Sequence, residues 1–381
     1  MMRIAIDAHT INKNFKAGIY VGTADLLTAL VKIDSDNDYQ LYFRGGVSNN
    51  LRFISERFHV KKLYCPDNLV FGRDIFLSLV PLALTCRLSS DRPDLFFAPT
   101  PFYPLHCCCP SVVKVHDVAA LKSDAYFETV NKIAYKQMLL YAVKRATRVI
   151  AISQWTKTEL INHTGIDPDK IEVIYRTHNS DMYWPRKDEK QICAVGQKYG
   201  IEGGYILYLG TLEPRKNLAR LIKAFDILRK KHGLPHKLVI AGAQGWLYSD
   251  IYATINQLRL NDDVIFTGYV PEELLPVLLS AADVLAYPSL YEGFGLPPLQ
   301  AMACGTPVVS SNVTSIPEVV GDAAVFVDPY NIDEIALALL SVLQDIKLRD
   351  ELSIKGIKRA KLFSMEKEAT QHLELFNSLW V

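Results

Sequence analysis

The feature that most constrains the fold of this chain is a regular alternation of short apolar runs with longer amphipathic stretches. Parallel β-sheets produce this pattern, because each strand is followed by a helix that carries the chain back to the starting edge. In the first half we predict helices over 23–33 and 130–146, and Ser153 as the N-cap of a further helix that carries Glu159. The strands predicted there are 2–6, 39–43, 60–63, 94–98, 111–116 and 148–152.

The alternation weakens over residues 176–204 and then starts again. That stretch contains Asn179, Pro185 and a charged run at 186–190, which is typical of a linker. The second series predicts strands at 205–209, 237–241, 264–267, 284–287 and 308–310, and helices at 218–232, 251–258, 272–281, 297–304 and 332–344. Two doubly wound α/β units in series predict a cleft between the carboxyl ends of their sheets.

The composition is that of a globular protein with balanced charge. Apolar residues make up 49% and charged residues 22%, which excludes a disordered chain, and a net charge of +1 gives no reason to expect nucleic-acid binding. Residues 1–200 hold 26 Lys and Arg against 20 Asp and Glu, whereas residues 201–381 hold 16 against 21. This asymmetry fits either peripheral contact of the basic half with anionic lipid or simple scatter of charges.

The cysteines and the N-terminus give no sign of a metal centre or of secretion. The seven Cys form no CxxC pair and no His cluster has metal-ligand spacing, so we expect reduced thiols, no metal and a cytoplasmic protein. The first ten residues do not form a signal peptide. The longest apolar runs are too short to span a bilayer, so any membrane contact is expected to be peripheral, at the inner face of the plasma membrane.

Two loops carry residues suited to binding an anionic ligand. The first, Gly210-Thr211-Leu212-Glu213-Pro214-Arg215-Lys216-Asn217, follows a predicted buried strand and opens a helix. Backbone N–H groups at such a turn, together with the adjacent cations, favour a diphosphate over a solvated helix start.

The second loop runs from Tyr287 to Gln300 and also follows a predicted strand. Gly293 and Gly295 allow close approach of a ligand to the backbone, and Glu292 is suited to sugar hydroxyl groups rather than to phosphate. A structural turn with a capping Glu explains this loop equally well by itself. A GxGxxG fingerprint is absent, which disfavours a nicotinamide cofactor, and we expect no cofactor.

Together these segments resemble the retaining glycosyltransferases of family 4, which have the GT-B fold of two Rossmann-like domains. The motifs GTLEPRKN, FTGYV and YPSLYEGFGLPPLQAMACGTPVV carry the resemblance, with VHDVAALK in the first half. The resemblance implies an acceptor-binding domain over 1–185, a linker over 186–204, and a nucleotide-sugar-binding domain over 205–360. It also implies that a C-terminal helix at 361–381 packs back on the first domain.

The same resemblance assigns roles to individual residues. It implies a catalytic set of four side chains, His116, Arg215, Lys216 and Glu292, in which the two cations hold the donor diphosphate and Glu292 holds the transferred sugar. His116 taken alone is more simply a core histidine at a strand end, but the following Asp117 and the family match favour approach to the sugar. Donor and substrate contacts are expected from Gly18, Gly210, Thr211, Tyr269, Val270, Gly293, Phe294, Gly295, Leu296 and Gln300.

Three departures from the family pattern stand out. Gln300 occupies the position of a second Glu that bonds the ribose; Gln keeps one acceptor and adds donors. The family's turn of the type GIGRY reads Gly18-Ile19-Tyr20-Val21-Gly22 here, without the second Gly and the Arg. The family's YNG turn reads Tyr175-Arg176-Thr177. These changes concern acceptor contacts more than donor contacts.

The expected activity is retaining, metal-independent transfer of a hexose from a nucleotide sugar to a saccharide or lipid-linked saccharide acceptor. UDP-glucose is the first choice of donor, with other UDP-hexoses and GDP-mannose also open. Cationic side chains and helix N-termini are expected to stabilise the departing diphosphate. Two alternatives remain: a GT-B nucleotide-sugar epimerase, and a non-catalytic protein that senses nucleotide sugars.

Overall fold

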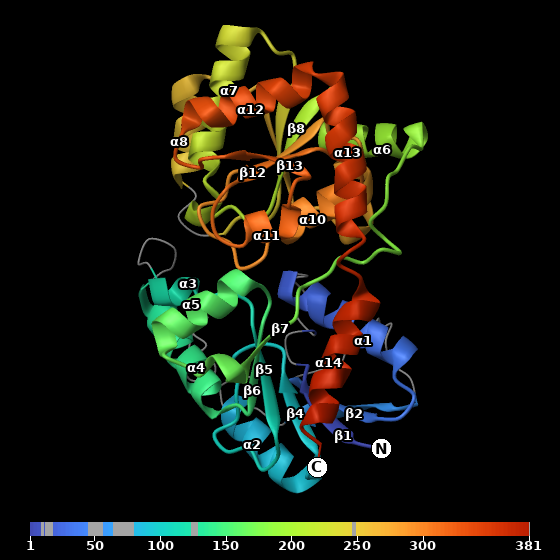
Figure 1. Cartoon of the computed structure of the whole chain (residues 1–381). Helices are drawn as coiled ribbons and strands as arrows, with labels where there is room; N and C mark the ends of the chain where they lie inside the picture. Colours follow the sequence, from blue (N-terminus) through green and yellow to red (C-terminus); the bar gives the residue numbers. More distant parts are fainter. Residues whose placement is uncertain are drawn as a thin grey trace. The chain divides into compact units, whose positions relative to one another are not determined.

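The chain folds into two compact units, which are described separately. The computed structural model describes residues 1–8, 11, 18–44, 56–63, 80–122, 129–245 and 249–380. Unit 1 comprises Met1–Thr177 and Met365–Val381, and unit 2 comprises His178–Ser364 (Figure 1).

Unit 1 is built on a parallel sheet whose seven described strands have the order β3-β2-β1-β4-β5-β6-β7. Strands β2 and β3 therefore lie on one side of β1, and β4 to β7 lie on the other side. This is the doubly wound arrangement that the alternation of strands and helices predicts. All six predicted strands are present, with ends shifted by at most two residues, and β7 is an additional strand. The strands are β1 (Arg3–Asp7), β2 (Asp38–Arg44), β3 (Phe58–Leu63), β4 (Leu95–Ala98), β5 (Ser111–Val115), β6 (Arg148–Ala151) and β7 (Ile171–Val173).

The helices of unit 1 cover its sheet. Ser153 is the predicted N-cap of α5, and its hydroxyl accepts a hydrogen bond from the Thr156 amide at 3.0 Å. The first helix begins at Gly18, five residues before the predicted start at residue 23. The helices are α1 (Gly18–Ile33), α2 (Val80–Asp91), α3 (Ala119–Lys122), α4 (Thr129–Arg145), α5 (Gln154–Thr164) and α14 (Met365–Ser378), with a 3₁₀ turn at Pro168–Lys170.

Unit 2 is a second doubly wound sheet, with the described strand order β10-β9-β8-β11-β12-β13. Its strands are β8 (Tyr205–Leu209), β9 (Lys237–Ala241), β10 (Val264–Gly268), β11 (Val284–Tyr287), β12 (Val308–Ser311) and β13 (Ala324–Val327). Its helices are α6 (Glu189–Tyr199), α7 (Leu218–His232), α8 (Ser249–Leu258), α9 (Leu275–Ser280), α10 (Leu296–Ala303), α11 (Ile316–Val320), α12 (Ile332–Gln344) and α13 (Ile346–Ala360), with 3₁₀ turns at Pro214–Lys216 and Glu272–Leu274.

Two predictions for unit 2 need correction. The expected linker at residues 186–204 contains α6, which begins at a capping Asp188 and ends at Gly200 in the left-handed region. The helix predicted over 272–281 is divided into a 3₁₀ turn and α9, with Pro276 in the first turn of α9. Proline lacks the N–H that a continuous helix needs and suits a first turn, so it restarts the helix.

The last helix, α14, belongs to unit 1 although it follows the whole of unit 2 in sequence. It packs against α1 (Figure 1). Met365, Ala369 and Phe376 join the same buried apolar cluster as Ile4 and Phe97. Burial of this apolar face gives a short helix at the end of the chain its stability.

Buried histidine in α14 makes the stability of unit 1 depend on pH. Burial, together with the charge of Lys114, lowers the pKa of His372 to about 3 from its ordinary 6.5. Below pH 6.5 the His372 imidazole binds a proton in the unfolded chain but not in the folded chain, so the free energy of unfolding falls as the pH falls. One such residue contributes about 1.4 kcal/mol per pH unit.

We therefore expect His372→Leu to flatten the loss of stability between pH 6.5 and 4.5 by about 1.4 kcal/mol per unit. Urea unfolding at several pH values measures how the free energy of unfolding changes with pH. Hydrogen exchange of the β1 and β5 amides reports the unfolding of unit 1. His59→Leu, an exposed position on β3, is the matched control. Parallel pH curves for wild type and His372→Leu would contradict the prediction.

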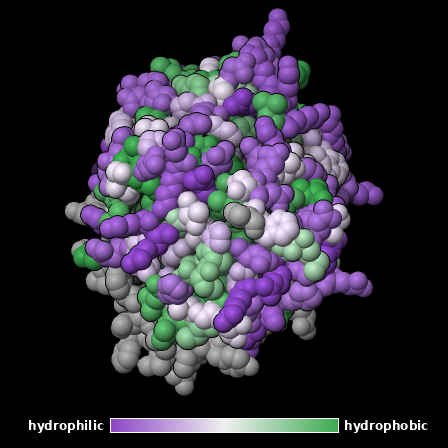
Figure 2. Space-filling view, turned by 60° about the horizontal axis from the view of Figure 1, so that its bottom comes forward, coloured by the Kyte–Doolittle hydropathy of each residue, from purple (hydrophilic) through white to green (hydrophobic). Residues whose placement is uncertain are grey.

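No helix in the described part of the chain is long and apolar enough to cross a membrane. On the face shown in Figure 2, hydrophilic residues are scattered widely and hydrophobic residues lie in small groups among them.

Candidate functional site

The two motif loops of unit 2 lie at the same edge of its sheet. The first follows β8 and the second follows β11, and these strands are parallel neighbours. Strands β9 and β10 extend to one side of β8, and β12 and β13 to the other side of β11. The two loops therefore flank the point where the strand order reverses, which is where open α/β sheets bind ligands.

The first loop is fixed to the second by its own backbone and by Asn217. The amide of Leu290 donates to the Arg215 carbonyl oxygen at 2.8 Å. The Asn217 side chain donates to the carbonyl oxygens of Pro288 and Pro329, at 2.9 and 2.7 Å. The loop does not lead directly into a helix as expected: a 3₁₀ turn intervenes, and α7 begins only after Asn217 in a left-handed conformation. This turn directs Lys216 inward rather than to solvent.

The functional side chains of the two loops form a buried cluster of two cations and two acids. Lys216 Nζ lies 2.6 Å from Glu292 Oε1, and the Tyr287 hydroxyl donates to the same oxygen at 2.7 Å. Arg215 Nη1 lies 3.4 Å from Glu292 Oε2, while Arg215 Nε lies 2.6 Å from Glu213 Oε1. We call Glu213, Arg215, Lys216 and Glu292 the charge cluster. Lys216 and Glu292 are each 6% exposed, so water screens these charges little.

Burial and pairing shift the pKa values within the charge cluster in different directions. Burial alone would raise the pKa of Glu292, but Lys216 and Arg215 outweigh it and hold that pKa below its usual value. Burial raises the pKa of Glu213 despite the same two cations. Burial, and then Arg215, lower the pKa of Lys216, opposed by the two acids. The two cations therefore favour the carboxylate form of Glu292 more strongly than that of Glu213.

The loop after Glu292 is shaped by Ser315 and Gly295. The Ser315 hydroxyl lies 3.0 Å from the carbonyl oxygens of Glu292 and Phe294. Gly295 has φ of 104°, and a Cβ there would meet Ile316 Cδ1 at 2.6 Å, so the position requires glycine. Leu296 starts α10, one residue before the predicted start, and Gln300 is buried on that helix.

The other residues of unit 2 that are predicted to contact the nucleotide sugar lie at the carboxyl ends of its strands. Gly210 follows β8, and Gly242 opposite it has no room for a side chain, since a Cβ would lie 2.0 Å from the Gly210 carbonyl oxygen. Thr211 is exposed. Tyr269 and Val270 follow β10; Tyr269 is 47% exposed, whereas Val270 is buried. An exposed aromatic ring at this edge of the sheet offers a surface on which a base can stack.

His116 and Gly18 belong to unit 1, at the carboxyl edge of its sheet. Gly18 is the first residue of α1. His116 directly follows β5 and its Nε2 lies 2.8 Å from the Pro99 carbonyl oxygen. A carbonyl only accepts, so Nε2 carries the proton and Nδ1 has a lone pair, for which the described residues supply no hydrogen-bond partner. Burial, then Arg176 and Lys114, hold the pKa of His116 well below its usual value.

Two family descriptions match the chain: "Glycosyltransferase Family 4" over residues 39–181 and "Glycosyl transferases group 1" over residues 197–359. The O-antigen chain mannosyltransferase B of Escherichia coli is 35% identical over 291 residues, which are 76% of each chain. The chain belongs to the group 1 glycosyltransferases of family 4.

One further relative and one solved structure extend the match to this glycosyltransferase. The serotype-specific mannosyltransferase WbdA of Escherichia coli is 29% identical over 369 residues, which are 93% of the present chain and 44% of WbdA. The solved structure of sucrose-phosphate synthase from Thermosynechococcus elongatus matches with a TM-score of 0.81 and 20% identity, over 100% of this chain and 99% of that one. The expected GT-B fold of two Rossmann-like units is thereby confirmed.

Sequence reasoning gives no role to Glu213 and Tyr287 in this glycosyltransferase. An acid such as Glu213 beside an anion site looks unfavourable, and Tyr287 simply ends a buried strand. Each nevertheless contacts a residue that the sequence does predict. The position of Tyr287 at the carboxyl end of the strand next to β8 is the sequence signal that could have found it.

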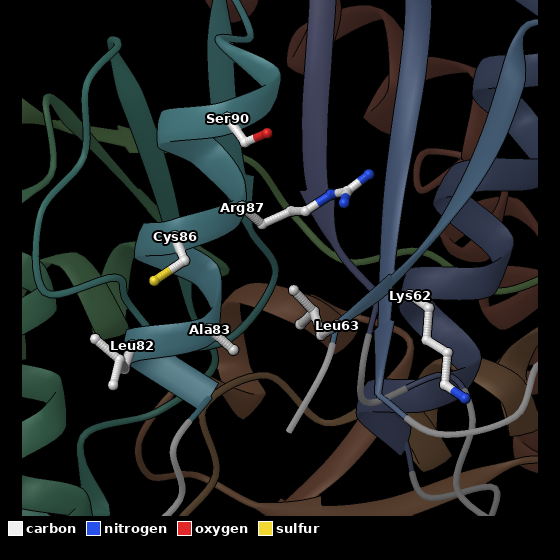
Figure 3. Close-up of a pocket in the computed structure, with 7 residues that line it drawn as sticks. All are labelled: Lys62, Leu63, Leu82, Ala83, Cys86, Arg87 and Ser90. Atoms are coloured by element: carbon white, nitrogen blue, oxygen red, sulfur yellow. The ribbon is translucent and has the colours of Figure 1, made fainter. Parts of the chain in front are cut away.

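A pocket of about 320 Å³ lies elsewhere in the glycosyltransferase, between β3 and α2 of unit 1 (Figure 3). Leu63 of β3 and Ala83 of α2 extend into the space between the two elements. The pocket is also lined by Lys62, Leu82, Cys86, Arg87 and Ser90. None of the predicted site residues lines it.

Proposed function

We propose that this glycosyltransferase is a retaining mannosyltransferase that uses GDP-mannose and acts in cell-surface polysaccharide synthesis. Mannose replaces glucose as the proposed sugar, because two relatives reported above are mannosyltransferases by name, one of O-antigen chains. The proposed acceptor is a saccharide or a lipid-linked saccharide. The net positive charge of residues 1–200 supports peripheral contact with an anionic membrane at its cytoplasmic face.

The observation that carries the proposal is the charge cluster at the switch point of unit 2. When a nucleoside diphosphate departs, negative charge builds on its β-phosphate. Arg215 and Lys216 are held rigidly beside that edge by Glu213 and Glu292, so they can stabilise this charge without reorganising. These cations support transfer without a metal ion.

Glu292 is proposed to position the transferred sugar rather than to attack it. Lys216 and Tyr287 orient its carboxylate, which is suited to accept hydrogen bonds from two sugar hydroxyl groups. The backbone of Gly293, Phe294, Gly295 and Leu296 is proposed to approach the sugar and its phosphate. Attack on the same face as the leaving group, with a phosphate oxygen taking the acceptor proton, requires no protein nucleophile and retains the anomeric configuration.

The other predicted residues have parts in the same proposal. The lone pair of His116 Nδ1 accepts a hydrogen bond from a hydroxyl of the transferred sugar. Gly18, Gly210 and Thr211 line the path of the diphosphate. Tyr269 and Val270 meet the base, and Gln300 bonds the ribose through its amide.

A panel of nucleotides tests the proposal directly. We expect GDP and GDP-mannose to raise the melting temperature more than UDP and UDP-glucose do, and a hundredfold excess over Kd to add about 2.7 kcal/mol to the free energy of unfolding. Transfer of labelled mannose to a saccharide acceptor, with and without EDTA, then measures turnover, which we expect EDTA to leave unchanged.

Each alternative gives a different result in this panel. Stabilisation by UDP but not by GDP would indicate that the donor is UDP-glucose rather than GDP-mannose. Interconversion or release of sugar without an acceptor would indicate an epimerase. Binding of a nucleotide sugar without turnover on any acceptor would indicate a sensor.

A further inference from the structure

Three consecutive cysteines, Cys107, Cys108 and Cys109, precede β5 in unit 1 and have no part in the proposed function. All three are free thiols. Because β5 is parallel to its neighbours β4 and β6, residues that precede it lie at the amino edge of the sheet. His116 lies at the opposite, carboxyl edge. The thiols therefore form a cluster apart from the predicted sugar site.

Two of the three thiols come close to each other. Cys107 Sγ lies 3.9 Å from Cys109 Sγ and 3.4 Å from the Cys109 carbonyl oxygen. Cys108 Sγ lies instead 3.4 Å from the carbonyl oxygen of Leu88 on α2. The sulfur atoms of a disulfide are about 2.05 Å apart, so Cys107 and Cys109 need to approach by about 2 Å to form one. The outer two thiols are thus the pair that is placed to react.

The segment just before this pair is held by two helices. The His106 amide donates to Thr85 Oγ1 of α2 at 3.2 Å. The Tyr141 hydroxyl of α4 donates to the Leu105 carbonyl oxygen at 2.7 Å. A segment that is already ordered loses little conformational entropy when two of its side chains react with each other. This favours a bond within the pair over a bond to a separate molecule.

Cys107 is the more reactive thiol of the pair. Both thiols are partly exposed to solvent, and both pack against the buried apolar cluster that includes Tyr103 and Val113. The hydrogen bond from Cys109 lowers the pKa of the Cys107 thiol to about 7 from its ordinary 9.0, although burial opposes this. The same hydrogen bond, together with burial, raises the pKa of Cys109. Cys107 therefore supplies the thiolate, the form that attacks disulfides, while Cys109 keeps its proton.

We propose that Cys107 and Cys109 form a site of reversible oxidation, which takes a low-molecular-weight disulfide as its oxidant and closes an intramolecular disulfide. The Cys107 thiolate attacks one sulfur of the small disulfide, forms a mixed disulfide and releases one small thiol. Cys109 then gives up its proton, attacks Cys107 Sγ and releases the second small thiol. Two protein thiols are oxidised to one disulfide, one small disulfide is reduced to two thiols, and the two protons pass to those thiols.

Oxidised glutathione and peptide masses test the site in the full chain. Trypsin does not cleave between Arg92 and Pro93, so residues 88–114 form one peptide that holds the three cysteines and no other. After oxidation and alkylation of the remaining thiols, we expect this peptide to carry one alkyl group and an internal disulfide. Reduction should restore three alkylated cysteines. Three alkyl groups after oxidation, or a disulfide to another peptide, would overturn the proposal.

Single replacements identify the two partners. We expect Cys108→Ser to form the disulfide as fast as the wild type does. Cys107→Ser should oxidise roughly tenfold more slowly, because it lacks the more reactive thiolate. Cys109→Ser should stop at the mixed disulfide with glutathione. An internal disulfide formed at the wild-type rate in Cys107→Ser would show that Cys108 and Cys109 pair, which contradicts the proposal.

Brief labelling of the native wild-type chain requires no replacement. With limiting iodoacetamide at pH 7, we expect Cys107 to be alkylated before Cys109, and fragmentation of the 88–114 peptide locates the label. Labelling of Cys109 first would overturn the assigned roles. Cys193→Ser, at an exposed thiol on α6 of unit 2, is the matched control and should leave the oxidation rate of the 88–114 peptide unchanged. None of these measurements uses a nucleotide sugar, so they decide the proposal even if the proposed function fails.

Discussion

Replacing Lys216 with Met is expected to lower kcat by roughly 100- to 1000-fold and to weaken nucleoside-diphosphate binding by about 10- to 100-fold. The ammonium group is buried, and it is held in place by Glu292 and Tyr287 before any ligand binds. Methionine keeps the length of the side chain but removes the charge that stabilises a departing diphosphate. Because the same charge also meets the diphosphate in the ground state, binding and turnover both fall.

The variant should also be less stable, since Glu292 loses its closest cation. Truncating one partner of a buried ion pair costs about 3–5 kcal/mol in the free energy of unfolding. Calorimetric titration with the nucleoside diphosphate, single-turnover kinetics and urea unfolding measure the three effects. Lys223→Met, at an exposed position of α7, is the control and should change none of them. Wild-type binding and turnover in Lys216→Met would refute the placement of the diphosphate at the charge cluster.

Glu292→Gln is expected to separate turnover from binding. Glutamine has the same shape and keeps an oxygen for the Tyr287 hydroxyl, so the loop should hold its conformation. The lost negative charge weakens the hold on sugar hydroxyl groups, and we expect kcat to fall by roughly 100-fold. Lys216 and Arg215 lose an acid that competes with the diphosphate, so affinity for the nucleoside diphosphate should stay the same or increase.

Measurement of Kd for the nucleoside diphosphate beside kcat for the nucleotide sugar distinguishes this role from a structural one. The surrounding cations lower the pKa of Glu292, so the carboxylate is ionised at neutral pH and the effect should persist on both sides of pH 7. Glu351→Gln, in an exposed pair with Lys355 on α13, is the control. Equal losses of binding and turnover would mean that Glu292 holds the loop rather than the sugar.

The strands and the positions of the two motif loops can be predicted from the sequence because they are recorded locally. A buried parallel strand reads as a short apolar run, so the predicted ends of β8, β9 and β11 are the observed ones. Residues that directly follow such strands must lie at the carboxyl edge of the sheet. The order of residues along the chain is therefore enough to assign Arg215, Glu292 and His116 to the sheet edges.

The sequence does not indicate which charged side chains pair with each other. Lys216 and Glu292 are 76 residues apart, and Lys114 and Glu368 are 254 apart. No periodic pattern links such positions, because each pairing depends on where two strands and two turns come together in space. Three contacts depend on the tertiary structure in this way. They are the pairing of the buried Lys216 with Glu292, the hydrogen bond to the Pro99 carbonyl that leaves a lone pair on His116 Nδ1, and the contact of Arg176 with Gly22.

The sequence by itself thus determined two doubly wound units, the family, and the edge of each sheet at which its functional residues lie. The tertiary structure alone decided that α6 occupies the predicted linker and that the cations of the site are paired with acids. The physical reason is the separation along the chain of the residues that determine each feature. Strand and helix periodicity reflects neighbours a few residues apart, whereas buried charges are fixed by long-range packing that must satisfy each of them.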